Sequence, residues 1–192
     1  MRERKRRLHT SEVLTKRATD NVYFGGDDML GSGRVIEAMI EYFGSDLKRI
    51  NHFLKVFAFA KTIGEGEKLD EYSQRVLEIS AIVHDIGIKV SEEKYNSSAG
   101  KYQELEGPAQ AQKLLSNLGF DEKFIDEVCY LVGHHHTYEN INTKPYQILV
   151  EADFLVNLFE DGVSANAVKS VEAKIFKTDT GRKLLKKMYA FN

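Results

Sequence analysis

Cysteine and long apolar runs are scarce in this sequence. Its 192 residues include a single cysteine, Cys129, within the apolar stretch 125–132, so no disulfide can form within the chain and a reducing compartment is favoured. A thiol in such surroundings is expected to act as a small buried hydrophobe rather than as a catalytic group. No run reaches 18 apolar residues, and the first residues lack the apolar middle of a secretory signal. We therefore expect a cytoplasmic protein with no membrane partner.

An excess of charge of one sign is also missing. The sequence has 27 lysines and arginines against 29 aspartates and glutamates, a formal net charge of -2. This balance argues against a general nucleic-acid-binding surface, so we expect no long nucleic acid as a partner. The basic cluster at residues 2–7 is followed by a glycine-rich stretch without periodicity. Residues 1–33 are predicted to form a basic and Gly-rich N-terminal extension or linker, and residues 34–192 one domain.

Helical periodicity is the pattern that the sequence does contain. Apolar residues recur at helical spacing from Val35 onward, and no sustained alternation of period two is present. Capping and turn residues predict helices over 35–43, 47–66, 71–84, 108–118, 122–132, 145–159, 164–174 and 179–189. The polar stretch 91–101 predicts an exposed loop of the kind that often serves as a lid. The fold class is therefore predicted to be all-α, a single-domain helical bundle.

Histidines and aspartates interrupt several of these apolar helices. The run 81–89 contains His84 and Asp85 side by side, while His52 and Asp153 lie on other apolar faces. An isolated carboxylate in an apolar interior loses far more hydration energy than packing returns, and a metal ion or a phosphate network would offset that cost. Imidazole and carboxylate together are the usual mixed ligand set for a divalent metal. Taken singly, each residue also fits an ordinary hydrogen-bonded core or surface role.

In their order along the chain, these residues resemble the signature of the HD superfamily of metal-dependent phosphohydrolases. The resemblance extends over about residues 35–159, and the positions that carry it are His52, His84-Asp85 followed by Ile86-Gly87, His134-His135, and Asp153. It implies an HD-type helical bundle with a divalent metal held by His52, His84, Asp85 and Asp153. It also implies that the protein hydrolyses a phosphate ester, of a nucleotide or another small molecule, by means of water that the metal activates.

Residues around the doublet are predicted to take part in such a reaction. Asp85 would both bind the metal and orient the attacking water. His134, His135 and Lys89 would stabilise charge in the transition state, although Lys89 fits a solvated surface position equally well. His136 is interpreted as a neighbour rather than a participant.

Two departures from the family pattern narrow the prediction. Two-metal members carry a histidine four residues before the glycine that is Gly107 here, and that position is Gln103. One metal ion is therefore favoured over two, and its identity is left open among Mn, Fe, Co, Ni, Mg and Zn. Ile88 stands where the cyclic-dinucleotide phosphodiesterases of the superfamily have a lysine, and no Gly-Tyr-Pro motif follows His136. That particular activity is disfavoured.

Other functions are compatible with the same residues. A di-iron oxygenase on the same scaffold is one alternative, against which Gln103 argues. A non-catalytic module that senses a nucleotide is another, although loss of activity would leave the buried acids without a compensating role. Phosphomonoester and phosphodiester hydrolysis are both open. Tyr189 and Phe191, two aromatic residues near the end of the chain, would suit the contact of a homodimer.

Overall fold

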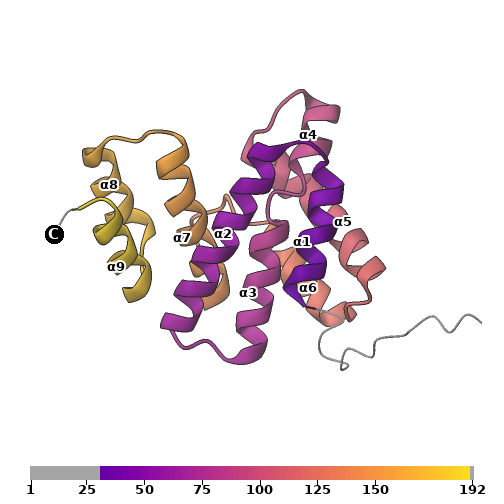
Figure 1. Cartoon of the computed structure of the whole chain (residues 1–192), viewed down its shortest axis with the longest axis horizontal. Coiled ribbons are helices and arrows are strands. Elements are labelled where there is room, and N and C mark those ends of the chain that lie inside the picture. Colours follow the sequence, from indigo (N-terminus) through magenta and orange to yellow (C-terminus); the bar gives the residue numbers. More distant parts are fainter. Residues whose placement is uncertain (1–30, 191–192) are drawn as a thin grey trace, which may run out of the picture.

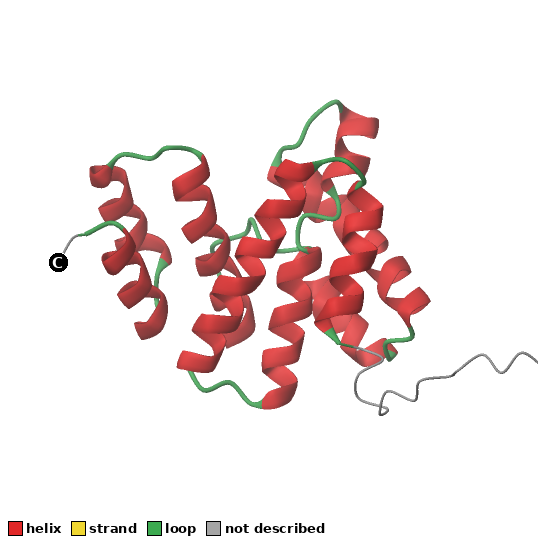
Figure 2. Ribbon diagram, viewed as in Figure 1, coloured by secondary structure: helices red, strands yellow, loops and turns green. Residues whose placement is uncertain are grey.

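The computed structural model describes residues 31–190, and within that range the chain forms α-helices and no strand (Figures 1 and 2). The helices are, in order, α1 (Ser32–Phe43), α2 (Leu47–Gly66), α3 (Glu71–Val83), α4 (Ile88–Tyr95), α5 (Gly100–Leu118), α6 (Glu122–Val132), α7 (Lys144–Glu160), α8 (Ala165–Ile175) and α9 (Asp179–Met188). The predicted all-α class is confirmed. The predicted extension lies outside the described residues except for its last three, and α1 already begins at Ser32.

Short polar side chains and glycines fix most of the helix ends. Asp46, Asp70 and Asp121 each precede a helix, and each accepts a hydrogen bond from the backbone N–H three residues later. Such a cap satisfies a donor that has no partner within the helix. At the other end, Gly44 and Gly119 close α1 and α5 with φ angles of 63° and 89°, which glycine adopts at little cost.

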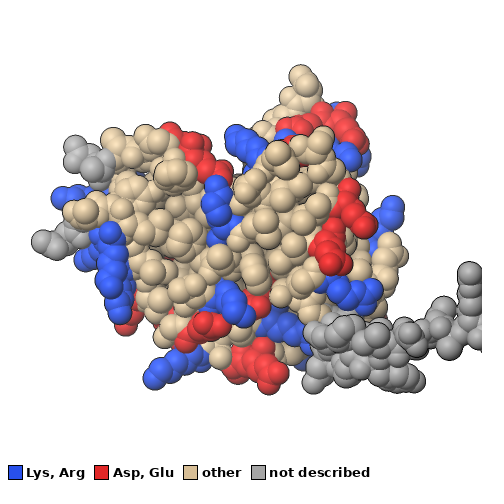
Figure 3. Space-filling model, viewed as in Figure 1, with Lys and Arg blue, Asp and Glu red and all other residues tan. Residues whose placement is uncertain are grey.

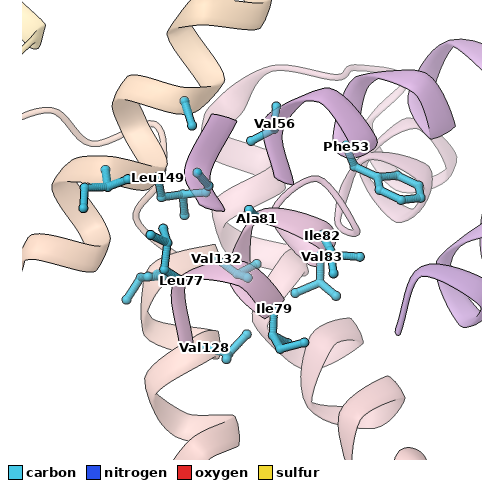
Figure 4. Close-up of a cluster of buried hydrophobic side chains, with 14 of the residues drawn as sticks. Phe53, Val56, Leu77, Ile79, Ala81, Ile82, Val83, Val128, Val132 and Leu149 are labelled. Atoms are coloured by element: carbon cyan, nitrogen blue, oxygen red, sulfur yellow. The ribbon is translucent and has the colours of Figure 1, made fainter. Parts of the chain in front are cut away.

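Helices α2, α3 and α7 lie side by side at the centre of the molecule (Figure 1). Helices α5 and α6 pack as a pair on one side of them, and α8 and α9 cover α7 on the other. Apolar side chains from the central helices and α6 fill the space between them (Figure 4), among them Phe53, Val56, Leu77, Ile79, Ala81, Ile82, Val83, Val128, Val132 and Leu149. Helices α2 and α7, together with the turn that follows α3, also carry the predicted metal ligands.

The prediction of an exposed loop over 91–101 is wrong, because most of this stretch is helical. Helix α4 covers its first half and α5 begins at Gly100. Only Ile88 and Ser91 of α4 are buried, so its sequence has the polar composition of a loop although its backbone is helical. Ser91 donates its hydroxyl proton to the Gly87 carbonyl oxygen (2.8 Å), and Asn96 ends the helix with a left-handed φ of 49°.

The predicted helix start at Pro108 is also wrong. Helix α5 begins eight residues earlier and passes through Pro108, at a typical cost of about 3 kcal/mol for an internal proline. Tertiary contacts offset this cost. Gly107 lies against the turn at Gly87, where an added Cβ would come 2.8 Å from the Gly107 nitrogen, and the Pro108 ring packs on Gly133.

A buried carboxylate joins the C-terminal helices to α7. Glu151 is fully buried and accepts hydrogen bonds from the backbone N–H groups of Lys177 (2.6 Å) and Thr178 (2.9 Å) just before α9. Tyr189 is half-buried against the core and Phe191 lies outside the described residues, so the homodimer contact stays a prediction. Within residues 31–190, every helix is too short or too polar to cross a membrane.

Candidate metal centre

Four side chains from α2, α7 and the turn after α3 meet in one cluster. The Nε2 atom of His52, on α2, lies 3.2 Å from Nε2 of His84 and 3.2 Å from Oδ1 of Asp153, on α7. Oδ2 of Asp85 lies 3.5 Å from both imidazole nitrogens. His84 and Asp85 reach the cluster because α3 ends at Val83 and the following turn directs both inward. The structure thus brings together the four ligands implied by the sequence resemblance.

The histidines of the cluster are oriented through their second ring nitrogen. In His84 and His135, Nδ1 faces a backbone carbonyl oxygen three residues earlier, at 2.9 Å and 2.7 Å. In His52, Nδ1 faces a carboxylate oxygen of Glu160 at 3.1 Å. Carbonyl and carboxylate oxygens only accept, so Nδ1 must carry the proton in all three rings. This leaves each Nε2, which faces the cluster, able to bind a metal.

Several buried polar atoms at this place make no hydrogen bond of acceptable geometry. They are Oδ1 of Asp153, Nε2 of His135, Nε2 of His136 and Oε1 of Gln103. Folded proteins leave few such atoms unpaired, because each costs about 1–3 kcal/mol. Their concentration at one site points to a ligand, and the oxygen and imidazole donors match what divalent metals bind. The residues present therefore fit a metal ion.

The carboxylates and imidazoles of the cluster change one another's pKa. Burial alone would raise the pKa of Asp85 and Asp153, but the neighbouring histidines outweigh it and lower the pKa of both carboxyl groups. Burial alone would lower the pKa of His52, but the nearby carboxylates of Asp153 and Asp85 raise that pKa to about 9. A proton on His52 thus balances part of the charge of the two acids, and a bound cation would take over that role as the proton leaves.

Asp85 also belongs to a second group of candidate ligands. Its Oδ1 lies 3.5 Å from Nε2 of His135, and ligand atoms of Asp85, His135 and His136 lie within 4.8 Å of one another. Asp85 therefore stands between the first group and these two histidines. Burial and the nearby His135 lower the pKa of His136 to about 4, so its imidazole is neutral at pH 7.

The structure places His134 away from the cluster. His136, and not His134, lines the pocket beside His135. The His134 ring stacks on Tyr130 with centroids 4.4 Å apart, and its Nδ1 lies 2.7 Å from the Tyr130 carbonyl oxygen. The turn after α6 sets this register, since Glu104 accepts the backbone N–H of His136 (3.0 Å) and the Tyr146 hydroxyl lies 2.6 Å from the His134 carbonyl oxygen. Which of three consecutive histidines faces inward depends on these distant contacts.

Lys89 also lies away from the cluster. Helix α3 ends before it and α4 begins at Ile88, so Lys89 is not one helical turn beyond Asp85. Its ammonium group is exposed and lies over the Tyr42 ring, 5.4 Å from the centroid. Ile88 lines the pocket in its place.

A pocket of about 260 Å³ opens above the cluster. Its lining consists of Asp46, Lys48, Arg49, His52, Asp85, Ile88, Ser98, Gln103, His136, Asp153, Asn157, Glu160 and Asp161. Sequence reasoning missed Arg49 and Glu160 and gave His136 no role. Spacing offered a signal for two of these: Glu160 follows Asp153 by seven residues, two helical turns on one face, and Arg49 precedes His52 by three.

An all-α bundle that closes a histidine–aspartate cluster beneath a polar pocket defines a class of metal-dependent hydrolytic proteins. The family model for the HD domain matches residues 49–177, so this chain belongs to the HD domain family, a superfamily of metal-dependent hydrolases. A crystal structure of a predicted HD superfamily hydrolase from an uncultured Thermotogales bacterium is similar, with a TM-score of 0.60 and 27% sequence identity over 82% of this chain and 84% of that chain. A search of curated proteins finds no match.

Proposed function

We propose that this protein is a metal-dependent phosphohydrolase that cleaves a phosphate ester of a nucleotide or another small molecule. The observation that carries the proposal is a set of unpaired buried atoms beside a complete His-Asp ligand set. Those of Asp153, His136 and Gln103 belong to residues that line one pocket, and that of His135 lies next to Asp85. Family membership supports hydrolysis by a metal-dependent mechanism. The pocket volume of about 260 Å³ suits a small ester rather than a polymer.

In this proposal His52, His84, Asp85 and Asp153 hold one divalent ion. When bound, such an ion lowers the pKa of a coordinated water toward about 7 and neutralises charge on the phosphoryl group. Asp85 points one carboxylate oxygen at the two histidines and the other at His135, so it can also accept a hydrogen bond from the attacking water. A single ion is proposed because Gln103 offers a poorer ligand than the histidine of two-metal members.

His136 is proposed to donate a hydrogen bond to the phosphoryl group. Its Nδ1 lies 3.4 Å from the Tyr138 hydroxyl oxygen, and burial raises the pKa of Tyr138 to about 12, so this hydroxyl keeps its proton and can donate it to Nδ1. The neutral imidazole then carries its own proton on Nε2, the atom left without a partner. A donor placed where charge develops in the transition state is worth about 100-fold or more in rate.

Cationic side chains at the pocket support an anionic substrate. Lys48 and Arg49 line it near the start of α2. Arg49 is already paired with Asp46 (2.8 Å) and Glu92 (2.6 Å), so its charge is largely balanced. Lys48 is exposed and makes no ion pair among the described residues, which leaves its charge available to a phosphate at the pocket mouth.

The test is an assay of phosphate release by the purified protein. Nucleoside mono-, di- and triphosphates, cyclic nucleotides and a chromogenic phosphate ester would each be incubated with Mn, Co, Ni or Mg, with Asp85→Ala as the inactive control. Hydrolysis of a cyclic nucleotide frees no phosphate, so chromatography would detect the monophosphate that it forms. We expect hydrolysis of at least one substrate that depends on both the metal and Asp85, and no hydrolysis in any combination would refute the proposal.

A di-iron oxygenase is the alternative function, and the observation that favours it is the second group of candidate ligands, Asp85, His135 and His136. If it binds a second ion, the scaffold would suit a di-iron oxygenase. Metal analysis of the purified protein that gives two irons per chain, together with oxygen consumption, would favour this function over hydrolysis.

A further inference from the structure

Glu160 links the cluster to a lysine on the outside of α2. One of its carboxylate oxygens lies 3.1 Å from Nδ1 of His52, and the other lies 2.5 Å from Nζ of Lys55. The side chain of Glu160 is 18% exposed, whereas that of Lys55 is 42% exposed. Lys55 follows His52 by three residues on α2, and Glu160 is the last residue of α7, so the three side chains form a chain from solvent to the cluster.

The position of Glu160 in its helix needs an explanation. It occupies the C-terminal end of α7, where the helix dipole disfavours a negative charge. Both of its carboxylate oxygens are engaged all the same, one by the Lys55 ammonium group and the other by Nδ1 of His52. The carboxylate is therefore held at an otherwise unfavourable place by the two side chains that it joins.

His52 differs from the other inward-facing histidines in this respect. His84 and His135 are oriented by backbone carbonyl oxygens, which are fixed by the helix and the turn themselves. Nδ1 of His52 instead faces a carboxylate, and a hydrogen bond to an ionised acceptor is roughly twice as strong as a neutral one. It fixes the ring so that Nε2 faces the cluster, and it makes that nitrogen a better donor to a metal.

We propose that Glu160 is a positioning residue for the metal ligand His52, and that Lys55 holds the Glu160 carboxylate in place for this role. The proposal rests on the metal site proposed above and adds two residues outside the ligand set. Glu160 acts by setting the orientation of His52 and by strengthening its donor nitrogen, and Lys55 acts by keeping the carboxylate from turning toward solvent.

The test is the affinity of the purified full-length protein for Mn²⁺, measured by isothermal titration calorimetry at one fixed pH. We expect Glu160→Ala to weaken binding by about 10–100-fold, the usual effect of removing the acid behind a ligating histidine. Glu160→Gln should restore part of the affinity, because its amide oxygen still accepts from Nδ1–H but carries no charge. Lys55→Ala should give a loss smaller than that of Glu160→Ala.

A matched control is available on the same helix. Lys61 of α2 pairs with Glu78 of α3 at 3.2 Å, and the Glu78 side chain is 13% exposed, but neither residue contacts a candidate ligand. Glu78→Ala should therefore leave the Mn²⁺ affinity unchanged. The melting temperatures of the metal-free variants would be compared as well, because a merely structural role for Glu160 would lower that temperature without a selective effect on binding.

Two results would overturn the inference while the proposed function stands. One is an affinity of Glu160→Ala within twofold of the wild type. The other is an equal loss of affinity in Glu78→Ala, which would make the effect a general consequence of breaking an ion pair. If the wild-type protein itself binds no Mn²⁺, Co²⁺, Ni²⁺ or Zn²⁺, the proposed metal site fails first and the inference fails with it.

Discussion

At the scale of single residues, the three consecutive histidines after α6 have different surroundings and so different chemistry. His134 stacks on Tyr130, His135 faces Asp85, and His136 faces the pocket as a neutral imidazole. The turn that separates them is held by contacts from α5 and α7. Identical side chains thus become a half-buried residue away from the cluster, a candidate ligand and a candidate hydrogen-bond donor.

Sequence reasoning assigned catalytic roles to His134 and Lys89, whereas the structure places His136 at the pocket. Mutations distinguish these two assignments. His136→Ala should lower kcat/KM by about 100-fold, because it removes a donor aimed at the pocket. Lys89→Ala and His134→Ala should each stay within about threefold of the wild type, since neither side chain reaches the cluster, and losses of surface groups are usually small. The measurement is kcat/KM for the best substrate of the phosphate-release assay. A loss in Lys89→Ala as large as that in His136→Ala would contradict the placement of Lys89.

The sequence reveals the centre of the site better than its surroundings. His84, Asp85 and Asp153 were marked because they interrupt apolar helices, where a buried polar group needs a partner, and the resemblance to the HD superfamily joined them with His52 into one ligand set. Spacing sets Glu160 on the same helical face as Asp153, but the sequence alone does not bring Glu160 or His136 into contact with the ligands. Their positions depend on the register of a turn and on where α7 ends against α2, and both are set by tertiary contacts.

At the scale of elements, the turn between α3 and α4 depends on a close approach of two backbones. An added Cβ on Gly87 would lie 2.6 Å from the Gln103 carbonyl oxygen and 2.8 Å from the Gly107 nitrogen. Both are backbone atoms of α5, so neither can move aside as a flexible side chain would. The absence of a side chain at Gly87 lets α5 lie directly on the turn that presents His84 and Asp85.

Gly87→Ala is therefore expected to destabilise the protein by about 1–3 kcal/mol, the usual cost of forcing extra volume into a packed site. Gly33→Ala is the matched control, because Gly33 lies in α1 with no atom within 4 Å of an added Cβ. It should be neutral or stabilising by up to about 1 kcal/mol. Urea denaturation of the metal-free proteins measures both. Equal free energies of unfolding for the two variants would show that α5 can move away from the turn.

The helices were predicted well where a capping residue marks the start and an apolar face marks the buried side. Helices that begin at an aspartate cap and bury an apolar face, such as α3 and α6, followed the prediction. Helix α4 did not, because it lies on the surface and only Ile88 and Ser91 are buried. The start of α5 was missed because proline usually marks a helix start, whereas here packing against Gly87 and Gly133 lets the helix continue through Pro108.

At the scale of the whole molecule, positive and negative side chains are interspersed on the surface, whereas the acids of the candidate site are gathered at one pocket. On the face shown in Figure 3, lysines and arginines lie among aspartates and glutamates over several helices instead of forming one field. The absence of a long nucleic acid partner stays a prediction. The acids of the cluster, by contrast, lie together at a pocket between α2, the turn after α3, and α7.

Because the ligands come from separate helices, a bound ion should stabilise the entire fold. A ligand present at 100 times its Kd stabilises the native state by about 2.7 kcal/mol. For a chain of this size each kcal/mol shifts the melting temperature by about 2–4 °C, so Mn²⁺ should raise it by roughly 5–11 °C over the protein in EDTA. Differential scanning calorimetry at a metal concentration fixed from the measured Kd gives this shift.

The control for this experiment is Asp153→Asn, which keeps the shape of the side chain but removes a charged ligand from α7. Its melting temperature should depend little on the metal at the same concentration, because the ion would no longer join α7 to α2 and α3. The same shift in wild type and variant would mean that the stabilising ion binds elsewhere. A shift confined to the wild type would tie the stability of the central helices to the His-Asp cluster.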